Sequence, residues 1–213
     1  PFASELTGDE SLRRRPMQRV ITPLRQMGAL IDAKEGGRPP LSIAASRGLQ
    51  GIHYDLPMAS AQVKSCVLLA GLFAEGETSV SEPAPTRDHT ERMLQGFGYR
   101  VEQRGNTVGL RGGGALHACE IDVPADISSA AFFLVAASIA PGSELLLTHV
   151  GINPTRTGVL RILELMGADI RLHNRREIGG EPVADLLVRH APLRGIEIPP
   201  ELVPLAIDEF PVL

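Results

Sequence analysis

The sequence predicts an α/β (α+β) fold in which helices cover sheets, and three observations support this prediction. An arginine-led segment that ends in a glycine occurs three times, beginning at Arg15, Arg87 and Arg156. The closing glycines lie about 70 residues apart, at positions 28, 98 and 167, and a fixed period of this kind indicates repeated structural units. The order strand, helix, strand, helix, strand, strand is predicted from about residue 52 and again from about residue 121, which is typical of helices packed on sheets.

The first copy shows how each unit is built. Its apolar residues recur at the spacing of one helix face: Met17, Val20, Ile21, Leu24 and Met27. Gly28 follows the last of them and can end the helix in the left-handed conformation. Pro16 and Pro154 suit a first helical turn, and Pro23 predicts a kink. We expect a strand after each of the three helices, and an apolar segment with a turn at residues 2–10.

The remaining elements follow in chain order. We predict a Gly/Pro-rich turn at 33–40, strands at 41–43, 51–56 and 78–81, a Ser-capped helix at 60–72 and a hairpin of 99–103 with 107–110. The second half predicts a strand at 119–123, a Ser-capped helix at 128–140, a strand at 145–147 and a paired 170–173 and 186–188. We expect Met93, Leu94 and Phe97 to be buried. The helix at 128–140 is apolar nearly all round, so it should be covered on most sides.

Composition excludes several classes of function. With 213 residues, 43% of them hydrophobic, and a net charge of −4, broad electrostatic attraction to nucleic acid is not expected. No apolar run reaches the ~20 residues of a membrane span, and no signal peptide is visible. Cys66 and Cys119 are isolated and suit reduced core thiols of a cytoplasmic protein. The six histidines show no ligand spacing, so neither a metal nor a cofactor is expected. We expect a monomer.

The segment from Val123 to Ala125 is the predicted domain junction, because the repeat restarts there after Gly112-Gly113-Gly114. A single continuous body is the alternative. The first residue is proline, and the last residues stop where a helix is predicted to begin, so we expect these residues to be an excerpt of a longer protein.

The candidate site consists of residues at predicted helix starts. If the helices of one unit run parallel, Arg15, Ser60, Arg87 and Asp208 line one cleft. Backbone amides and guanidinium groups bind phosphate and carboxylate, and a carboxylate can move a proton. A small polyanionic substrate is therefore expected.

Each of these residues also has a purely structural interpretation. Ser60 is suited to capping a helix, and Gln62 to the exposed side of its first turn. Arg15 and Arg87 suit surface ion pairs, the latter with Asp88 or Glu91. Asp208 beside Glu209 suits a charged helix start. We interpret Lys64, His89 and the basic run at 13–14 as solvated. Residue types alone do not choose between an anion-binding enzyme and a structural module.

Four sequence motifs point to a particular protein family. They are Leu56-Pro57-Met58-Ala59-Ser60-Ala61-Gln62-Val63-Lys64-Ser65, Thr86-Arg87-Asp88-His89-Thr90-Glu91-Arg92-Met93-Leu94, Asn153-Pro154-Thr155-Arg156-Thr157-Gly158 and Ile207-Asp208-Glu209-Phe210-Pro211. Together, in this order, they resemble the 3-phosphoshikimate 1-carboxyvinyltransferase (EPSP synthase) family. Thr7-Gly8-Asp9-Glu10-Ser11-Leu12 and Arg15-Pro16-Met17 fit the same family. The resemblance spans the whole chain.

The resemblance implies an enzyme of two domains, each made of three βαβαββ-type units whose helix amino ends face an interdomain cleft. It implies transfer of the enolpyruvyl group of phosphoenolpyruvate to the 5-hydroxyl of shikimate 3-phosphate with release of phosphate, in aromatic amino acid biosynthesis. By motif, Ser60, Ala61 and Gln62 would bind shikimate 3-phosphate, with Gln62 also near phosphoenolpyruvate. Arg87 would bind on the shikimate phosphate side, Arg15 would bind phosphoenolpyruvate, and Asp208 would be the general base or acid.

The resemblance also implies an incomplete enzyme. Residues 1–123 would be the latter two units of the first EPSP synthase-like domain, and residues 124–213 the opening part of the second. The family's N-terminal Lys-Ser and Arg segment, its glycine-rich phosphoenolpyruvate loop and its C-terminal basic groups have no counterpart here. We therefore expect little or no catalysis from these residues alone.

Two other functions stay open at this point. UDP-N-acetylglucosamine 1-carboxyvinyltransferase shares the fold and the enolpyruvyl donor, but its cysteine-bearing loop is not expected here, because Cys66 falls in a predicted helix and Cys119 in a predicted strand. Ser60-Ala61-Gln62 also favours the shikimate branch. The alternative from another class is a non-catalytic module that binds polyanions or a partner chain.

Overall fold

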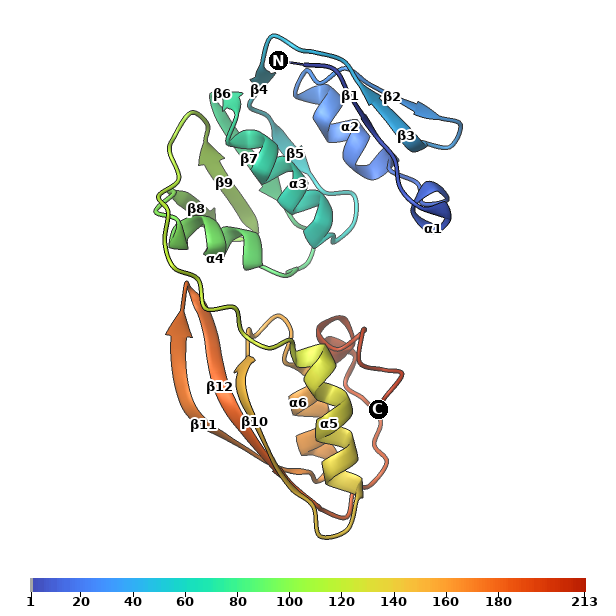
Figure 1. Ribbon diagram of the computed structural model, residues 1–213, viewed down its shortest axis with the longest axis vertical. Coiled ribbons are helices and arrows are strands. Elements are labelled where there is room, and N and C mark those ends of the chain that lie inside the picture. The colour runs from blue at the N-terminus through green and yellow to red at the C-terminus, as the bar shows by residue number, and fades with distance from the viewer. Residues whose placement is uncertain (1) are drawn as a thin grey trace. The chain divides into compact units, whose positions relative to one another are not determined.

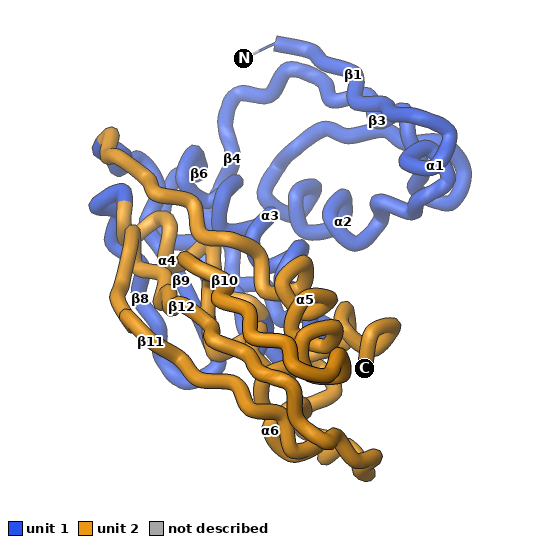
Figure 2. The backbone as a smooth tube through the Cα atoms, turned by 60° about the horizontal axis from the view of Figure 1, so that its bottom comes forward, with its two compact units in different colours: residues 1–86, 97–117 blue, residues 87–96, 118–213 orange. Residues whose placement is uncertain are grey.

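The computed structural model describes residues 2–213, which form two compact units. Unit 1 comprises the chain up to residue 86 together with residues 97–117, and unit 2 comprises residues 87–96 together with 118–213 (Figure 2). The short segment 87–96 thus belongs to unit 2, although residues before and after it belong to unit 1. Each unit is described by itself below.

Unit 1 begins with a small antiparallel sheet of strand order β1-β3-β2. Its elements are β1 (Ser4–Leu6), α1 (Glu10–Arg13), α2 (Gln18–Gln26), β2 (Ile31–Lys34) and β3 (Arg38–Ile43) (Figure 1). Helix α2 packs on this sheet through a core of Ile21, Ile31 and Leu41. Gly28 follows the helix with φ of 98°, a conformation that glycine adopts without a Cβ clash, so the predicted helix end is confirmed.

A second, four-stranded sheet of order β5-β7-β9-β8 completes unit 1. Its elements, with a two-stranded pair β4-β6, are β4 (Leu49–Gln50), β5 (His53–Asp55), α3 (Ala61–Gly71), β6 (Ala74–Glu75), β7 (Glu77–Ser81), β8 (Val101–Arg104) and β9 (Thr107–Arg111). Helix α3 packs against β7 and β9. The predicted hairpin is confirmed: Arg104 pairs with Thr107 across Gly105-Asn106, where Gly105 has φ of 61°.

Unit 2 contains an antiparallel sheet of order β10-β12-β11. Its elements are α4 (His89–Gly96), α5 (Ile127–Ile139), β10 (Glu144–Gly151), α6 (Gly158–Met166), β11 (Asp169–Ile178), β12 (Glu181–Arg189) and the 3₁₀ helix η1 (Pro200–Leu205). Helices α5 and α6 lie on the same face of the sheet (Figure 1). The core between them and the sheet includes Leu134, Val150, Ile162, Leu163 and Leu186, each at most 1% exposed.

The predicted repeat is confirmed in the strand pairing. In each copy a strand (β1, β7 or β10) pairs antiparallel with the last strand of a following hairpin (β3, β9 or β12), and the first hairpin strand lies on the other side. A parallel strand precedes the second copy, where β5 pairs with β7. In the third copy a single parallel bridge between Ala125 and Val150 takes its place. Arg15, Arg87 and Arg156 each lie between the first strand of a copy and its helix, α2, α4 or α6.

Several predicted elements differ from the structure. The turn expected at 33–40 is limited to residues 35–37, because residues 33–34 belong to β2 and 38–40 to β3. Pro39 and Pro40 are accommodated in β3 because the register to β2 jumps from Ala33–Leu41 to Lys34–Arg38, so neither proline needs to donate a ladder hydrogen bond. The strand expected at 51–56 is limited to β5, at residues 53–55, and β4 precedes the expected range.

The strand predicted at 119–123 is absent. This segment has no regular secondary structure and pairs with no strand, and Ile121 and Val123 are 43% and 76% exposed. An alternating pattern forms a strand only where another strand can pair with it. Cys119 is consequently exposed, so its prediction as a core thiol is wrong.

Two burial predictions are also wrong. Helix α5 leaves Phe132, Phe133 and Ile139 58–60% exposed, because only its side toward β10 and β12 is covered within unit 2. On α4, Leu94 is buried as predicted but Met93 is 51% exposed. No helix in residues 2–213 combines the length and apolar character needed to cross a membrane.

Candidate functional site

Arg87 and Asp208 form an ion pair in unit 2. The guanidinium NH2 lies 2.5 Å from Asp208 Oδ2, and the two side chains are 41% and 50% exposed. Arg87 precedes α4 by two residues, and Asp208 lies in the turns after η1. No helix begins at Asp208, so its structural interpretation as a charged helix start is wrong; Glu209 N–H bonds to Ala206 O in a turn. Of the six predicted site residues, the structure joins these two.

Arg156 is a second cation beside Asp208. Its side chain is 16% exposed and lies 3.9 Å from Asp208, 3.6 Å from Asp126 and 3.7 Å from Glu209. It also donates to the hydroxyl of Ser128. Like Arg87, Arg156 precedes its helix by two residues, so topologically equivalent arginines of two repeats meet at one carboxylate.

The start of α5 completes the cluster. Asp126, rather than the predicted Ser128, caps α5, because its Oδ2 accepts from the backbone N–H of Ser129 at 2.9 Å. Partial burial raises the pKa of Asp126, but hydrogen bonds from the backbone and hydroxyl of Ser129 outweigh it, so the pKa lies below the ordinary value. Ser128 instead donates to Glu209, whose side chain is 2% exposed. We refer to Arg87, Asp126, Ser128, Arg156, Asp208 and Glu209 as the Asp208 cluster.

The amino-terminal ends of α4, α5 and α6 therefore gather around Asp208. Two guanidinium groups and the first turns of three helices favour anions. Asp126 and Glu209 offset part of this positive charge, because they lie 3.6 and 3.7 Å from Arg156. The side chains of Asp208 and Asp126 are 50% and 56% exposed, so a ligand can reach both, but Asp126 already accepts hydrogen bonds from the backbone and the hydroxyl of Ser129. The arrangement can bind an anionic group at Arg87 and accept a proton at Asp208.

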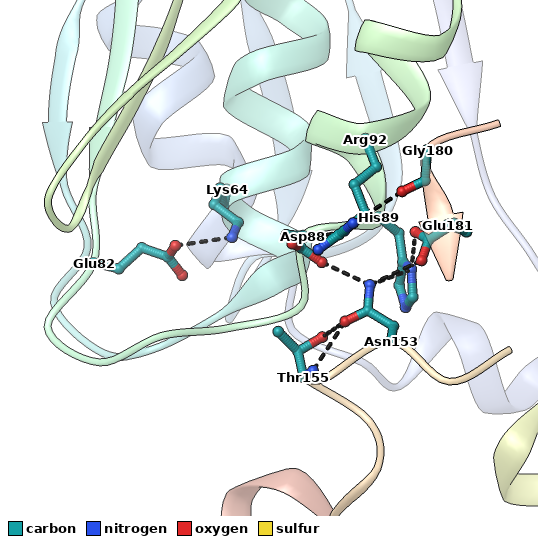
Figure 3. A network of polar contacts seen from close by, with 9 residues as sticks. All are labelled: Lys64, Glu82, Asp88, His89, Arg92, Asn153, Thr155, Gly180 and Glu181. Carbon is teal, nitrogen blue, oxygen red and sulfur yellow. Dashed lines mark hydrogen bonds and ion pairs between the residues drawn. The ribbon is translucent and has the colours of Figure 1, made fainter. Parts of the chain in front are cut away.

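Figure 3 shows a network around Asn153, which includes Asp88 and Thr155, the sequence neighbours of Arg87 and Arg156. Asn153 is 2% exposed, and its amide donates to Asp88 Oδ1 at 2.7 Å and to Glu181 Oε2 at 2.9 Å. His89 Nδ1 lies 2.6 Å from Glu181 Oε1. His89 is therefore a partly exposed but bonded residue, rather than a merely solvated one.

The other four predicted site residues belong to unit 1. Ser60 is half-buried and caps α3, with its hydroxyl accepting from the backbone N–H of Val63 at 3.4 Å. Ala61 is half-buried and Gln62 is exposed in the first turn of α3. Arg15 is exposed beside a shallow hollow that Asp9, Glu10 and Ser11 also line. The contacts described within unit 1 do not join Arg15 to the start of α3.

Lys64 corrects an expectation from sequence. It is 1% exposed rather than solvated, and its Nζ donates to Glu82 Oε1 at 2.8 Å (Figure 3). Lys64 lies on the buried side of α3, one turn after the Ser60 cap and beside the buried Val63. A buried ammonium group needs a carboxylate partner, and Glu82 supplies it.

Three groups of the site are not among the six site residues predicted from sequence: Arg156, Asp126 with Ser128, and Asn153. A signal existed for Arg156, because it lies eleven residues before its closing glycine, as Arg87 does. Asn153 opens one of the four motifs, but its bonds to Asp88 and Glu181 could not be predicted from sequence, because both residues are distant in the chain. Within residues 2–213 no group of three or more His, Cys, Asp or Glu side chains is placed to hold a metal ion.

Comparison with known proteins decides the family. A family model described as EPSP synthase (3-phosphoshikimate 1-carboxyvinyltransferase) matches residues 1–213, the full length of the sequence. The chain belongs to the EPSP synthase family. The EPSP synthase resemblance of the four motifs is therefore confirmed, and so is the predicted fold class.

Relatives support this assignment at high identity. A 3-phosphoshikimate 1-carboxyvinyltransferase from Alkalilimnicola ehrlichii is 68% identical over 212 residues, which are 100% of this chain and 48% of that protein. The corresponding protein from Methylococcus capsulatus is 66% identical with the same coverage. A solved EPSP synthase from Acinetobacter baumannii superposes with a TM-score of 0.91 at 60% identity, covering 99% of this chain and 48% of that one. The chain thus spans about half the length of these EPSP synthases.

Proposed function

We propose that the complete protein carrying this sequence transfers the enolpyruvyl group of phosphoenolpyruvate to the 5-hydroxyl of shikimate 3-phosphate and releases phosphate. The observation that carries the proposal is the Asp208 cluster in a chain whose relatives, 60–68% identical, are named 3-phosphoshikimate 1-carboxyvinyltransferase or EPSP synthase. We further propose that residues 1–123 belong to the first domain of that enzyme and 124–213 to the second, that it acts as a monomer in the cytoplasm and that these residues alone are inactive.

The chemistry of the reaction matches the groups present. The hydroxyl oxygen forms a bond to C2 of phosphoenolpyruvate, the bond from C2 to the phosphate oxygen breaks, and the hydroxyl proton must be removed. Asp208 would accept that proton as general base, because it is a half-exposed carboxylate in contact with Arg87, the residue proposed to bind the substrate phosphate. Positively charged groups that bind carboxylate and phosphate would stabilise the charge that develops.

Arg87 would have two partners in turn. In the structure its NH2 lies 2.5 Å from Asp208 Oδ2. A shikimate 3-phosphate group offers more negative charge than one carboxylate and a bidentate set of oxygens, so Arg87 would move to it. This exchange would leave Asp208 free to meet the hydroxyl. Ser60, Ala61 and Gln62 would bind the same substrate, and Arg15 and Gln62 would lie near phosphoenolpyruvate.

One observation removes an argument against the alternative activity, that of UDP-N-acetylglucosamine 1-carboxyvinyltransferase. Cys119 lies in an exposed loop instead of a strand, so its position no longer argues against UDP-N-acetylglucosamine 1-carboxyvinyltransferase. Ser60-Ala61-Gln62 and the names of the relatives still favour the shikimate substrate. The identity of the acceptor, shikimate 3-phosphate or UDP-N-acetylglucosamine, therefore has to be tested directly.

The deciding experiment measures phosphate release by the complete gene product with phosphoenolpyruvate and either acceptor. We expect turnover with shikimate 3-phosphate and none with UDP-N-acetylglucosamine. Turnover of the uridine-linked sugar alone would assign the rival activity. Binding of shikimate 3-phosphate without release of phosphate under any condition would indicate a non-catalytic polyanion-binding protein.

A further inference from the structure

Asn153 has a role that the proposed reaction does not include. Its side chain is 2% exposed and uses both ends of its amide (Figure 3). On the donor side, Nδ2 bonds to Asp88 Oδ1 and Glu181 Oε2 at 2.7 and 2.9 Å. On the acceptor side, Oδ1 receives the backbone N–H and the hydroxyl of Thr155 at 2.9 and 2.7 Å. A buried amide with all of these partners holds one orientation.

The donor side of the Asn153 amide bonds to Asp88, the residue that follows Arg87. Asp88 also accepts a hydrogen bond from Arg92 Nε at 2.8 Å, and Arg92 NH1 donates to Gly180 O at 2.9 Å. The beginning of α4 is thus fixed to Asn153 and to the turn before β12. Because Arg87 is adjacent to Asp88, the direction of its side chain depends on this attachment.

The acceptor side of the Asn153 amide bonds to Thr155, the residue before Arg156. The two bonds to Thr155 close a turn over residues 153–155, and Arg156 follows directly. The backbone N–H of Arg156 bonds to Asn153 O at 2.8 Å and tightens the same turn. One asparagine therefore lies next to both arginines that approach Asp208.

We propose that Asn153 is a positioning residue that keeps Arg87 and Arg156 within ion-pair distance of Asp208, and so sets where the shikimate phosphate binds relative to the base. This inference rests on the proposed function. The amide suits the place because it supplies a neutral donor between two carboxylates, Asp88 and Glu181, which a third carboxylate would repel.

The substitution Asn153→Asp tests the donor side of the amide separately from its acceptor side. The new carboxylate retains the oxygen that accepts from Thr155 but loses the donor and repels Asp88 and Glu181. In the complete protein we expect kcat/KM to fall at least tenfold and KM for shikimate 3-phosphate to rise, with KM for phosphoenolpyruvate changed less than twofold. A merely structural role would lower the fraction of active protein, and hence kcat, without this selective change in KM.

Exchanging the two partners supplies a rescue. In Asn153→Asp with Asp88→Asn, the amide at 88 can donate to the carboxylate at 153 while its oxygen still accepts from Arg92. We expect the double variant to recover kcat/KM at least threefold over Asn153→Asp. If KM for shikimate 3-phosphate stays within twofold of the unmodified protein in Asn153→Asp, or if the exchange recovers nothing, the proposal is overturned.

Two further variants keep the test interpretable. Asn174→Gly removes a different amide-to-carboxylate bond of unit 2, from Asn174 Nδ2 to Asp185 Oδ2 at 2.8 Å, and glycine tolerates the φ of 49° there. It should leave both KM values unchanged. Should Asn153→Asp fail to fold, Thr155→Val removes only the hydroxyl of the acceptor side, and kcat/KM should fall at least threefold; an unchanged value overturns the proposal.

The inference is separable from the proposed reaction. If the unmodified complete protein does not turn over shikimate 3-phosphate, the proposed function fails, and positioning is then judged from the Kd for inorganic phosphate. Arg87→Gln should raise this Kd less in the Asn153→Asp background than in the unmodified protein, because Arg87 is already displaced there. Equal fold-changes of the Kd in both backgrounds overturn the inference.

Discussion

Arg87 and Asp208 are 121 positions apart in the sequence, yet their side chains are in contact. Their partial exposure means that the pair itself adds little stability, since exposed ion pairs contribute roughly 0–1 kcal/mol. Its significance is chemical, because it places a cation that can bind an anionic substrate against a carboxylate that can move a proton. The residue-scale predictions address these two functions separately.

Replacing Arg87 by glutamine should weaken substrate binding in the complete protein. The change removes a charged donor, and hydrogen bonds to charged groups contribute about 1.5–3 kcal/mol, so the Kd for shikimate 3-phosphate should rise about 10- to 100-fold. Isothermal titration calorimetry measures this. Arg161→Gln is the matched control, because Arg161 is 55% exposed and pairs with Glu164 within the same helix. An equal effect of both substitutions would contradict the role of Arg87.

Replacing Asp208 by asparagine should abolish most turnover while preserving binding. The amide retains the size of the side chain but cannot act as a base, and general acid–base groups contribute about 10²–10⁴ in rate. We expect kcat to fall by that factor in the complete protein and the Kd for shikimate 3-phosphate to change much less. Glu144→Gln, which removes an exposed carboxylate paired with Arg189, provides the control. Retention of more than about half of kcat would exclude Asp208 as the base.

At the scale of elements, the site depends on how closely α6 approaches η1. A Cβ built on Gly158 would lie 2.7 Å from Leu205 C and 2.8 Å from Leu205 Cβ. Only glycine permits this approach at the start of α6. The approach brings Arg156, just before α6, near Asp208, just after η1.

Gly158→Ala should therefore destabilise unit 2. Overpacking of this kind costs about 1–3 kcal/mol in the free energy of unfolding, which denaturant titration measures. Gly195→Ala is the matched control, because a Cβ there has no neighbour within 4 Å. If the two variants are equally stable, the close contact at Gly158 is not important.

Asp185 of β12 bonds to His149 and Asn174, which lie at the register shifts of β10 and β11, and its carboxylate should make stability depend on pH. The side-chain amide of Asn174, followed by the backbone N–H of His149, holds the pKa of Asp185 below its ordinary value. A lowered pKa in the folded state means that Asp185 stabilises the fold above the unfolded-state pKa of about 3.9, and this contribution is lost as the pH falls through the folded-state pKa.

Asp185→Asn tests this dependence. The variant should be less stable than the unmodified protein at neutral pH, and the difference should shrink as the pH is lowered below about 4. Melting temperatures across this range provide the measurement. Asp32→Asn is the control, because the Asp32 side chain is 96% exposed. A difference between Asp185→Asn and the unmodified protein that does not change with pH would contradict the assigned cause.

At the scale of the whole molecule, one topological unit occurs three times, and each copy carries an arginine between its first strand and its helix. Repetition explains how a single cluster collects two equivalent arginines at helix starts, since the second copy contributes Arg87 before α4 and the third contributes Arg156 before α6. The chain covers 48% of the length of its EPSP synthase relatives. Other copies of the unit, and their binding groups, would come from the remainder of the complete protein.

The 213 residues by themselves should show little or no turnover. We expect phosphate release from shikimate 3-phosphate and phosphoenolpyruvate with the complete protein, and less than about 1% of that rate with the isolated segment, because groups worth 10²-fold or more would be missing. Circular dichroism and a cooperative melting transition verify that the isolated segment is folded. Full activity of the folded segment would contradict the proposal that it is only part of the site.

The sequence by itself determined the fold class, the repeat and most elements. These features depend on local signals: the apolar spacing of α2, the serine before α3 and the glycines at 28, 98 and 167 act over a few residues. The motif residues also identified the family. Where local signals failed, a neighbour was missing or unexpected: residues 119–123 found no strand to pair with, Phe132 and Phe133 were left uncovered, and Pro39-Pro40 entered a strand through a register shift.

The tertiary structure decided which charged residues meet. Lys64 is buried against Glu82, Arg156 joins Arg87 at Asp208, and Asn153 connects Asp88 with Glu181. None of these contacts could be predicted from spacing, because each joins residues from different elements of the chain. Ion pairs and buried amides depend on position in space, whereas helices and turns depend mainly on adjacent residues.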